Sequence, residues 1–229
     1  MENLVLPAPA PVLLPVSGSD GLFPVRRIFC VGRNYAEHAR EMGLDPEKKK
    51  PFFFNKPVDT AIPSGRTIPF PVATENLHHE AELVVAIGTG GMDIAPEDTA
   101  THIWGYAAGN DLTRRDLQAQ AKEDRRPWCM AKGFDNSAVI GPLKPATECG
   151  DMTRGAIRCH VGDDVRQDGD LSEMIWPTAN IISFLSGLVT LQPGDLIMTG
   201  TPAGVGQLHA GETCTISIDG LDSATVTLA

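Results

Sequence analysis

The segment LHHEAELVVAIG, residues 77–88, is mostly apolar yet carries two carboxylates, Glu80 and Glu82. Its run of branched aliphatic residues predicts a buried β-strand. Successive side chains of a strand alternate between its faces, so the two carboxylates point the same way, about 7 Å apart along the chain. Two like charges on one face repel each other, and the pattern therefore needs a physical reason.

Spacing alone leaves two interpretations of this pair open. One is the wetted face of an antiparallel strand, although the same face continues through apolar residues. The other is a cation site, because hard ions such as Mg²⁺, Mn²⁺ or Ca²⁺ prefer several converging carboxylate oxygens. Asp111, at the end of the segment WGYAAGND, is a candidate third ligand. His78 and His79 are adjacent and point to opposite faces, so they do not form the i, i+2 pair expected of zinc ligands on one strand.

Short strands and turns with few helices are expected around this segment, because 23 glycines and 18 prolines are spread along the chain. Strands are expected over 26–32 and 51–57, and hairpins over 155–169 and 212–229. The strands do not alternate regularly with helices, which argues against a Rossmann-type sheet.

Three helices are expected. The first runs over 34–43, with Asn34 as N-cap and Gly43 as the C-terminal stop. The second begins at Thr113, with Asp116 completing a capping box, and the third is amphipathic and covers 178–188.

The chain has 229 residues, of which 42% are hydrophobic, enough for one large core. We expect an extended N-terminal arm over residues 1–24 and one domain over 25–229. The apolar start of the chain is not expected to be a signal peptide, because Glu2 replaces the usual positive charge and prolines interrupt the apolar run.

The net charge of −10 makes nucleic acid and anionic membrane poor candidate partners. No apolar stretch reaches 18 residues, so no membrane span is expected. The five cysteines form no C-x-x-C pair, which fits neither a zinc ribbon nor a disulfide framework. A reducing, cytoplasmic location is expected.

Three further features could serve catalysis, each with a plainer alternative. His38 and Glu41 share a helix face, as a base that activates water needs, but a surface ion pair has the same spacing. Lys132 follows the apolar PWCMA, and could also be a snorkelling lysine at a strand end. The loop TGTPAGVG (199–206) could hold a carboxylate, or could need its glycines only for its turns.

Taken in order, six segments resemble the fumarylacetoacetate hydrolase family: VGRNYAEHAREMG, FFFNKP, LHHEAELVVAIG, GYAAGNDLTRRDLQ, RPWCMAKGFDNSAVIGP and LQPGDLIMTGTPAGVG. They cover nearly everything from about residue 25 onward. The spaced set H-x-E-x-E, N-D-x-T-x-R-D-x-Q, A-K-x-F and T-G-T-P is far more specific than any one piece. Within the family, the amino-acid sequences of the first and fourth segments are most similar to those of the acylpyruvate hydrolases.

The resemblance implies an α+β fold, a mixed β-roll with a few peripheral helices, and a homodimer. It implies one divalent cation, Mg²⁺ or Mn²⁺, held by Glu80, Glu82 and Asp111. His38 and Glu41 would lie on a lid and Lys132 in the active site. The residues implied on the substrate side are Arg33, Arg115, Gln118 and Thr201.

The implied activity is metal-dependent hydrolysis of a C–C bond in a β-diketo acid, with fumarylpyruvate giving fumarate and pyruvate, as in gentisate breakdown. His38, oriented by Glu41, would take a proton from water, and Lys132 would stabilise the tetrahedral oxyanion. Alternatives on the same scaffold are an oxaloacetate decarboxylase or a 2-oxo acid isomerase or decarboxylase. A non-catalytic keto-acid binding protein is a third possibility.

Overall fold

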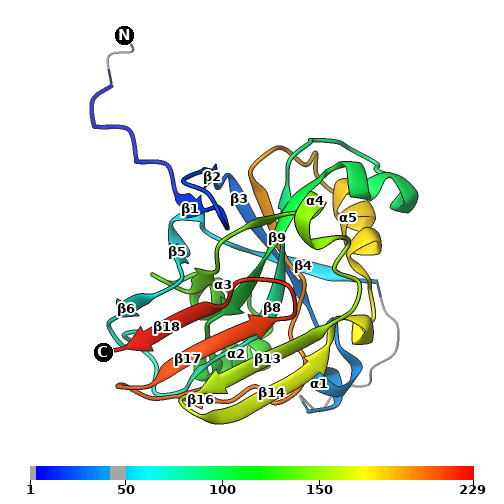
Figure 1. Cartoon of the computed structure of the whole chain (residues 1–229). Helices are drawn as coiled ribbons and strands as arrows, with labels where there is room; N and C mark the ends of the chain where they lie inside the picture. The colour runs from blue at the N-terminus through cyan, green and yellow to red at the C-terminus, as the bar shows by residue number, and fades with distance from the viewer. Residues whose placement is uncertain (1–3, 42–49) are drawn as a thin grey trace.

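Two mixed β-sheets face each other across the main hydrophobic core, and the helices lie at the periphery (Figure 1). This computed structural model describes residues 4–41 and 50–229. In that part of the chain no helix is both long enough and apolar enough to cross a membrane.

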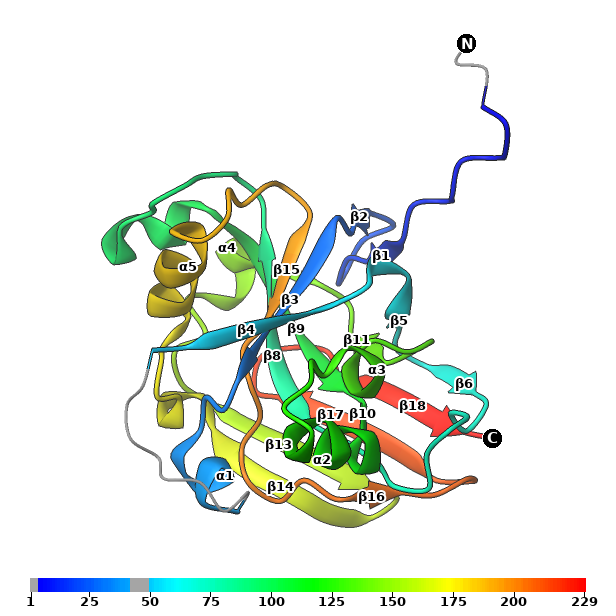
Figure 2. The same cartoon turned by 180° about the vertical axis from the view of Figure 1, so that it is seen from behind.

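The larger sheet has eight strands in the order β4-β3-β15-β8-β9-β11-β5, with β12 beside β9 (Figure 2). The β15–β3 and β11–β5 pairs are parallel and the others are antiparallel. The bounds are β3 Arg27–Gly32, β4 Phe52–Lys56, β5 Ala61–Pro63, β8 Ala81–Ile87, β9 Ile103–Asp111, β11 Ala138–Ile140, β12 Lys144–Pro145 and β15 Asp195–Met198.

The second sheet has five strands in the order β14-β13-β17-β18-β6, of which only the β18–β6 pair is parallel. Its bounds are β6 Arg66–Ile68, β13 Ala156–Val161, β14 Asp164–Asp170, β17 Thr213–Ile218 and β18 Ala224–Leu228. Both predicted hairpins are confirmed, as β13–β14 and as β17–β18.

Two smaller sheets complete the strands. They are formed by β1 (Leu13–Pro15) with β2 (Leu22–Pro24), and by β10 (Thr113–Arg114), β7 (Leu77–His78) and β16 (Gln207–Leu208). The helices are α1 Ala36–Glu41, α2 Arg115–Glu123, α3 Cys129–Lys132, α4 Ala146–Cys149 and α5 Thr178–Ser186. Short 3₁₀ turns cover Val58–Thr60, Pro96–Thr101 and Leu171–Glu173.

The two faces of β8 have different surroundings, and this difference positions the site. One face packs into the main core between the two sheets through Leu83, Val85 and Ile87. The other carries Val84 and Ala86 into a second apolar cluster with β3, β15 and the β1–β2 hairpin. Glu82 lies on this second face, so it sits at the end of an apolar layer and away from water.

The N-terminal segment from Leu4 to Pro11 has no regular structure and extends away from the body in both views (Figures 1 and 2). Leu14 and Phe23 of the β1–β2 hairpin are buried in the second apolar cluster. The predicted division of the chain after residue 24 stays a prediction.

Both predicted N-caps are wrong, because the two side chains bond to backbone carbonyls outside the helices, Asn34 at long range and Thr113 two residues back. The Asn34 amide donates to the carbonyls of Trp176 and Thr199, and α1 starts two residues later. Thr113 lies in β10 and donates to the Asp111 carbonyl. The predicted stop at Gly43 lies outside the described residues.

The carboxylate expected to complete the second cap also has another role. Asp116 accepts hydrogen bonds from the Thr74 hydroxyl and from the backbone N–H of Glu75. These bonds hold the pKa of Asp116 below its ordinary value, outweighing the opposing effect of desolvation. The helix starts at Arg115 with no side-chain cap, so this carboxylate anchors the chain that enters β7.

Two other expectations are corrected. The segment 77–88 is two strands, β7 and β8, with His79 and Glu80 between them. Lys132 ends the short helix α3 and is buried, so it is not a snorkelling lysine at a strand end.

A candidate active site around three buried carboxylates

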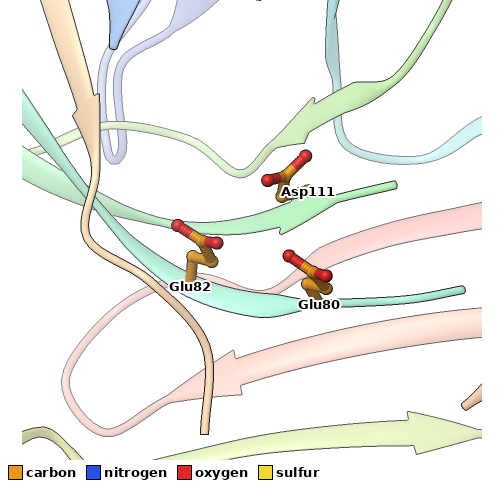
Figure 3. Close-up of side chains that lie close together, drawn as sticks. All are labelled: Glu80, Glu82 and Asp111. Atoms are coloured by element: carbon orange, nitrogen blue, oxygen red, sulfur yellow. The ribbon is translucent and has the colours of Figure 1, made fainter. Parts of the chain in front are cut away.

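Glu80, Glu82 and Asp111 converge, and one oxygen from each lies within 4.8 Å of the others (Figure 3). All three residues are buried. The antiparallel β8–β9 pair brings them together, because Glu82 lies opposite Gly109 and the Asp111 N–H donates to the Glu80 carbonyl over 2.9 Å. The prediction that these three carboxylates share one place is confirmed; their role as metal ligands stays a prediction.

The loop after β15 closes the site from another side. The backbone N–H of Gly200 donates to Glu82 Oε2 over 2.7 Å. Gly200 has a φ of +95°, and a Cβ there would lie 2.7 Å from Cβ of Asn34. Only glycine fits this approach without strain, so the glycine of T-G-T-P is needed to bring a donor to the carboxylate.

Three basic side chains surround the carboxylates. Lys132 Nζ lies 2.7 Å from Glu80 Oε2 and 2.7 Å from Asp111 Oδ2. Arg115 pairs with the other oxygen of Glu80. Lys56 Nζ is fully buried 2.8 Å from Asp111 Oδ1, without the alignment of a hydrogen bond, and it also donates to the carbonyls of Lys132 and Leu112.

The pKa values of Glu80 and Glu82 are shifted in opposite directions. Burial disfavours the ionised form of Glu80, but the charges of Lys132 and Arg115 outweigh it and hold the pKa of Glu80 well below its usual range. Burial, together with the charges of Asp111 and Glu80, raises the pKa of Glu82 well above its ordinary value. A buried carboxylate in this position gains stability when a cation approaches it.

The residues present fit a divalent cation. Formal charges of three carboxylates and three basic side chains sum to zero. Carboxylate oxygens are the ligands that Mg²⁺ and Mn²⁺ prefer. Asp111 Oδ1 accepts no aligned hydrogen bond within the described part of the chain, although the Lys56 ammonium lies 2.8 Å from it. Glu80, Glu82 and Asp111 would hold such an ion.

His38 and Glu41 form the predicted pair on α1, with His38 Nδ1 3.2 Å from Glu41 Oε2. His38 is buried, so the plainer alternative of a surface ion pair does not describe it. Burial is the main cause that lowers the pKa of His38 below its ordinary value. Glu41 also accepts from the backbone N–H of Gly204, which fixes α1 against the loop 199–206.

The two adjacent histidines have hydrogen-bond partners other than the carboxylates. His79 Nδ1 lies 3.0 Å from Gln167 Oε1, and His78 Nε2 lies 2.9 Å from Asn76 Oδ1. Desolvation lowers the pKa of His79 and lowers that of His78 to about 4. Gln167 also donates to Thr201 Oγ1 over 2.8 Å, which orients that hydroxyl.

A partly open cleft lies beside the carboxylates. Eight of the ten residues singled out from the sequence line it: Arg33, His38, Glu80, Glu82, Arg115, Gln118, Lys132 and Thr201. The other two, Asp111 and Glu41, contact residues that do. The structure therefore gathers the whole predicted set, and the roles of its members remain to be tested.

Four residues of the site were missed. Lys56 contacts Asp111, Gln167 accepts from the backbone N–H of Ala81 between Glu80 and Glu82, and Lys122 and Trp128 line the cleft. Lys56 had a sequence signal, a charge at the end of an aromatic strand before a proline. Lys122 had one as well, since it follows Arg115 and Gln118 at the spacing of one helix face. Gln167 had no local signal, because it comes from the second sheet.

The chain belongs to the fumarylacetoacetate hydrolase family: the family model "Fumarylacetoacetate (FAA) hydrolase C-terminal" matches residues 27–229. The structure superposes with a TM-score of 0.96 on a fumarylpyruvate hydrolase of Pseudomonas aeruginosa in complex with Mn²⁺ and pyruvate, at 50% identity over 99% of each chain. The mixed β-roll with few helices is thus confirmed. The protein is an enzyme of this family.

Other relatives carry different names. An oxaloacetate tautomerase of Arabidopsis thaliana is 40% identical over 85% of this chain and 87% of its own. An oxaloacetate decarboxylase of Dictyostelium discoideum is 37% identical over 86% and 91%. Both are named as mitochondrial, and the predicted cytoplasmic location of this chain stays a prediction.

Proposed function

We propose that this protein is a divalent-metal-dependent acylpyruvate hydrolase whose main substrate is fumarylpyruvate. The observation that carries the proposal is a buried histidine, His38, which pairs with Glu41 and lines the same cleft as Glu80 and Glu82 of the three converging carboxylates. The similarity over the full chain to a fumarylpyruvate hydrolase supports the same assignment.

The metal would be Mg²⁺ or Mn²⁺ on Glu80, Glu82 and Asp111. When bound, it supplies a Lewis acid for the 2-oxo acid end of the substrate. Its two positive charges add to a cluster that is formally neutral, so a dicarboxylate meets net positive charge there. The Mn²⁺ and pyruvate in the P. aeruginosa enzyme support this choice of ion and product.

His38 is the proposed general base. Its Nδ1 faces Glu41, so the Nδ1–H tautomer leaves Nε2 free to accept a proton from water. The lowered pKa keeps the imidazole neutral near pH 7, as a base requires. The hydroxide then adds to the acyl carbonyl, the bond to the pyruvyl methylene breaks, and its electron pair leaves as pyruvate enolate. The proton taken by His38 can return to that carbon.

Lys132 and Thr201 are the proposed donors to the substrate. The Lys132 ammonium has three N–H donors and gives two to Glu80 and Asp111, which leaves one for the tetrahedral oxyanion. Thr201 Oγ1 accepts from Gln167, so its own hydrogen is free to donate to the substrate carboxylate. Arg115 and Gln118, bonded to each other over 2.7 Å, would position the 2-oxo acid end.

The second candidate is an oxaloacetate decarboxylase or tautomerase, which the 37–40% identical relatives favour. All these reactions pass through an enolate, and only hydrolysis needs an activated water. The His38–Glu41 pair supports hydrolysis for that reason. The same pair and the buried lysine argue against a non-catalytic binding protein.

A substrate panel tests the proposal. The purified protein is assayed with Mg²⁺ or Mn²⁺ by loss of ultraviolet absorbance from fumarylpyruvate, maleylpyruvate and acetylpyruvate, and by pyruvate release from oxaloacetate. We expect kcat/KM to be highest for fumarylpyruvate. Turnover of oxaloacetate alone would contradict the proposal and support the second candidate.

We also propose a homodimer, on the family resemblance. Sedimentation velocity at micromolar concentration gives the mass directly, and a single species of 24.5 kDa would overturn it.

A further inference from the structure

Four basic side chains line the cleft, and two of them already have acidic partners. Lys132 bonds to Glu80 and Asp111, and Arg115 bonds to Glu80. Their charges are therefore matched by the protein itself.

The other two cations, Arg33 and Lys122, form no ion pair with any residue in 4–41 or 50–229. Each lies over an aromatic ring instead. Lys122 Nζ is 5.3 Å from the centre of the Trp128 ring, and the Arg33 guanidinium is 5.4 Å from that of Phe52. These two rings contact each other edge to face at 5.4 Å, so the two cations flank one aromatic wall.

The arrangement of Arg33 and Lys122 is energetically unfavourable in the absence of a ligand. Burial and the charges of Arg115 and Arg33 lower the pKa of Lys122 to about 8. Arg33 has a φ of +61°, a left-handed conformation that is unfavourable for a residue with a side chain. Cations gathered in a cleft without acidic partners form a binding site for an anion.

The position of the unpaired cations indicates which part of a substrate they meet. Arg115, Gln118 and Lys122 follow one another along one face of α2. Arg115 is at the carboxylate cluster, and Lys122 is seven residues further on, about 10 Å along the helix axis. That separation is comparable to the length of extended fumarylpyruvate, which has a carboxylate at each end.

We propose that Lys122, assisted by Arg33, binds the carboxylate at the acyl end of the substrate and thereby selects acylpyruvates that carry a second carboxylate. The inference rests on the proposed hydrolase function and names the determinant of its substrate class. Trp128 and Phe54, whose rings contact each other at 5.9 Å, provide an apolar wall for the carbon chain between the two ends.

The test compares Lys122→Met with the wild type on fumarylpyruvate and on acetylpyruvate, which lacks the second carboxylate. We expect the ratio of the two kcat/KM values to fall about 10- to 100-fold, mostly through KM for fumarylpyruvate, because one charged hydrogen bond is lost. Lys122→Arg keeps the charge and should restore most of the ratio.

The matched control is Arg126→Met, which removes one positive charge just beyond the same helix, where the side chain is 74% exposed. It should leave both kcat/KM values within about 2-fold, since surface substitutions have small effects. An unchanged ratio in Lys122→Met, or an equal loss on both substrates, would overturn the inference.

A binding measurement separates this inference from the function on which it rests. If the wild type cleaves no acylpyruvate, the hydrolase proposal fails. Calorimetric titration of the Mn²⁺-loaded protein with fumarate and with pyruvate then tests the cations alone. Weaker binding of fumarate to Lys122→Met, with pyruvate unaffected, would support the inference, and equal affinities of wild type and variant for fumarate would refute it.

Discussion

The two ends of the cleft differ in how their charges are matched. At the carboxylate end, Lys56, Lys132 and Arg115 each pair with an acidic side chain. At the other end, Arg33 and Lys122 lie over aromatic rings without an acidic partner in the described part of the chain. At the carboxylate end the charges are paired before any ligand binds. At the acyl end a bound anion would supply the missing acidic partner.

This difference indicates which end of the cleft would carry out the chemistry and which end would select the substrate. A fully paired network is rigid and holds reacting groups in place, but it offers little free charge to tell one substrate from another. Unpaired cations contribute nothing until an anion arrives, and their contribution then depends on that anion. Changes at the carboxylate end should therefore affect every substrate, and changes at the acyl end only some.

Metal removal should have the largest effect, because it takes the proposed Lewis acid away from the carboxylate end. Dialysis against a chelator, or Glu82→Ala, should reduce kcat/KM by at least about 10³-fold on every substrate that the enzyme cleaves. Readdition of Mn²⁺ should restore the dialysed protein and not the variant. Glu97→Ala removes an exposed carboxylate and is the control. Full activity after exhaustive chelation would contradict the metal assignment.

Removal of the proposed general base should have the second-largest effect. His38→Ala should keep the fold and lose about 100-fold or more in kcat, because water is no longer deprotonated in place. Circular dichroism and the melting temperature check the fold. Glu41→Gln should lose less, since it weakens orientation of the imidazole and keeps the base. Wild-type rates in His38→Ala would remove this residue from the mechanism.

Removal of the buried lysine behind Asp111 should affect stability more than selectivity. Lys56→Met leaves Asp111 with one cation fewer in a fully buried place, and we expect a loss of about 3 kcal/mol in the free energy of unfolding. Mn²⁺ should recover part of this loss, because it supplies positive charge to the same carboxylate. Urea titrations with and without Mn²⁺ measure both values.

The control for that experiment is Lys144→Met, whose ammonium donates to a backbone carbonyl at the surface. Its effect should stay within about 0.5 kcal/mol. Equal stabilities for Lys56→Met and the wild type would show that the buried pair does not support the site.

The smallest expected effect is a dependence of stability on pH. Burial lowers the pKa of His38, His78 and His79, so each takes up a proton more readily in the unfolded chain. Below about pH 6.5 the unfolded state binds more protons, and the free energy of unfolding falls as the pH falls toward about 4. His78→Gln should reduce this slope by up to one proton. An unchanged slope would contradict the half-buried, neutral state of His78.

The sequence by itself determined the features that depend on spacing along one segment. Alternation along the extended chain put Glu80, just before β8, on the same side as Glu82; helix periodicity put His38 beside Glu41, and turn residues placed both hairpins. These are local rules, so they hold before the chain is folded.

Only the tertiary structure decided which groups meet across segments. Gln167 reaches His79 and Thr201 from the second sheet, and Lys56 reaches Asp111 from β4, a strand that the sequence predicted without indicating its partner. Local patterns also failed where long-range partners competed for a side chain, as Trp176 and Thr199 did for Asn34 and as Thr74 did for Asp116. The physical reason is the same in both cases: a buried polar group must find a partner, and the partner is chosen by the packing of the sheets rather than by distance along the chain.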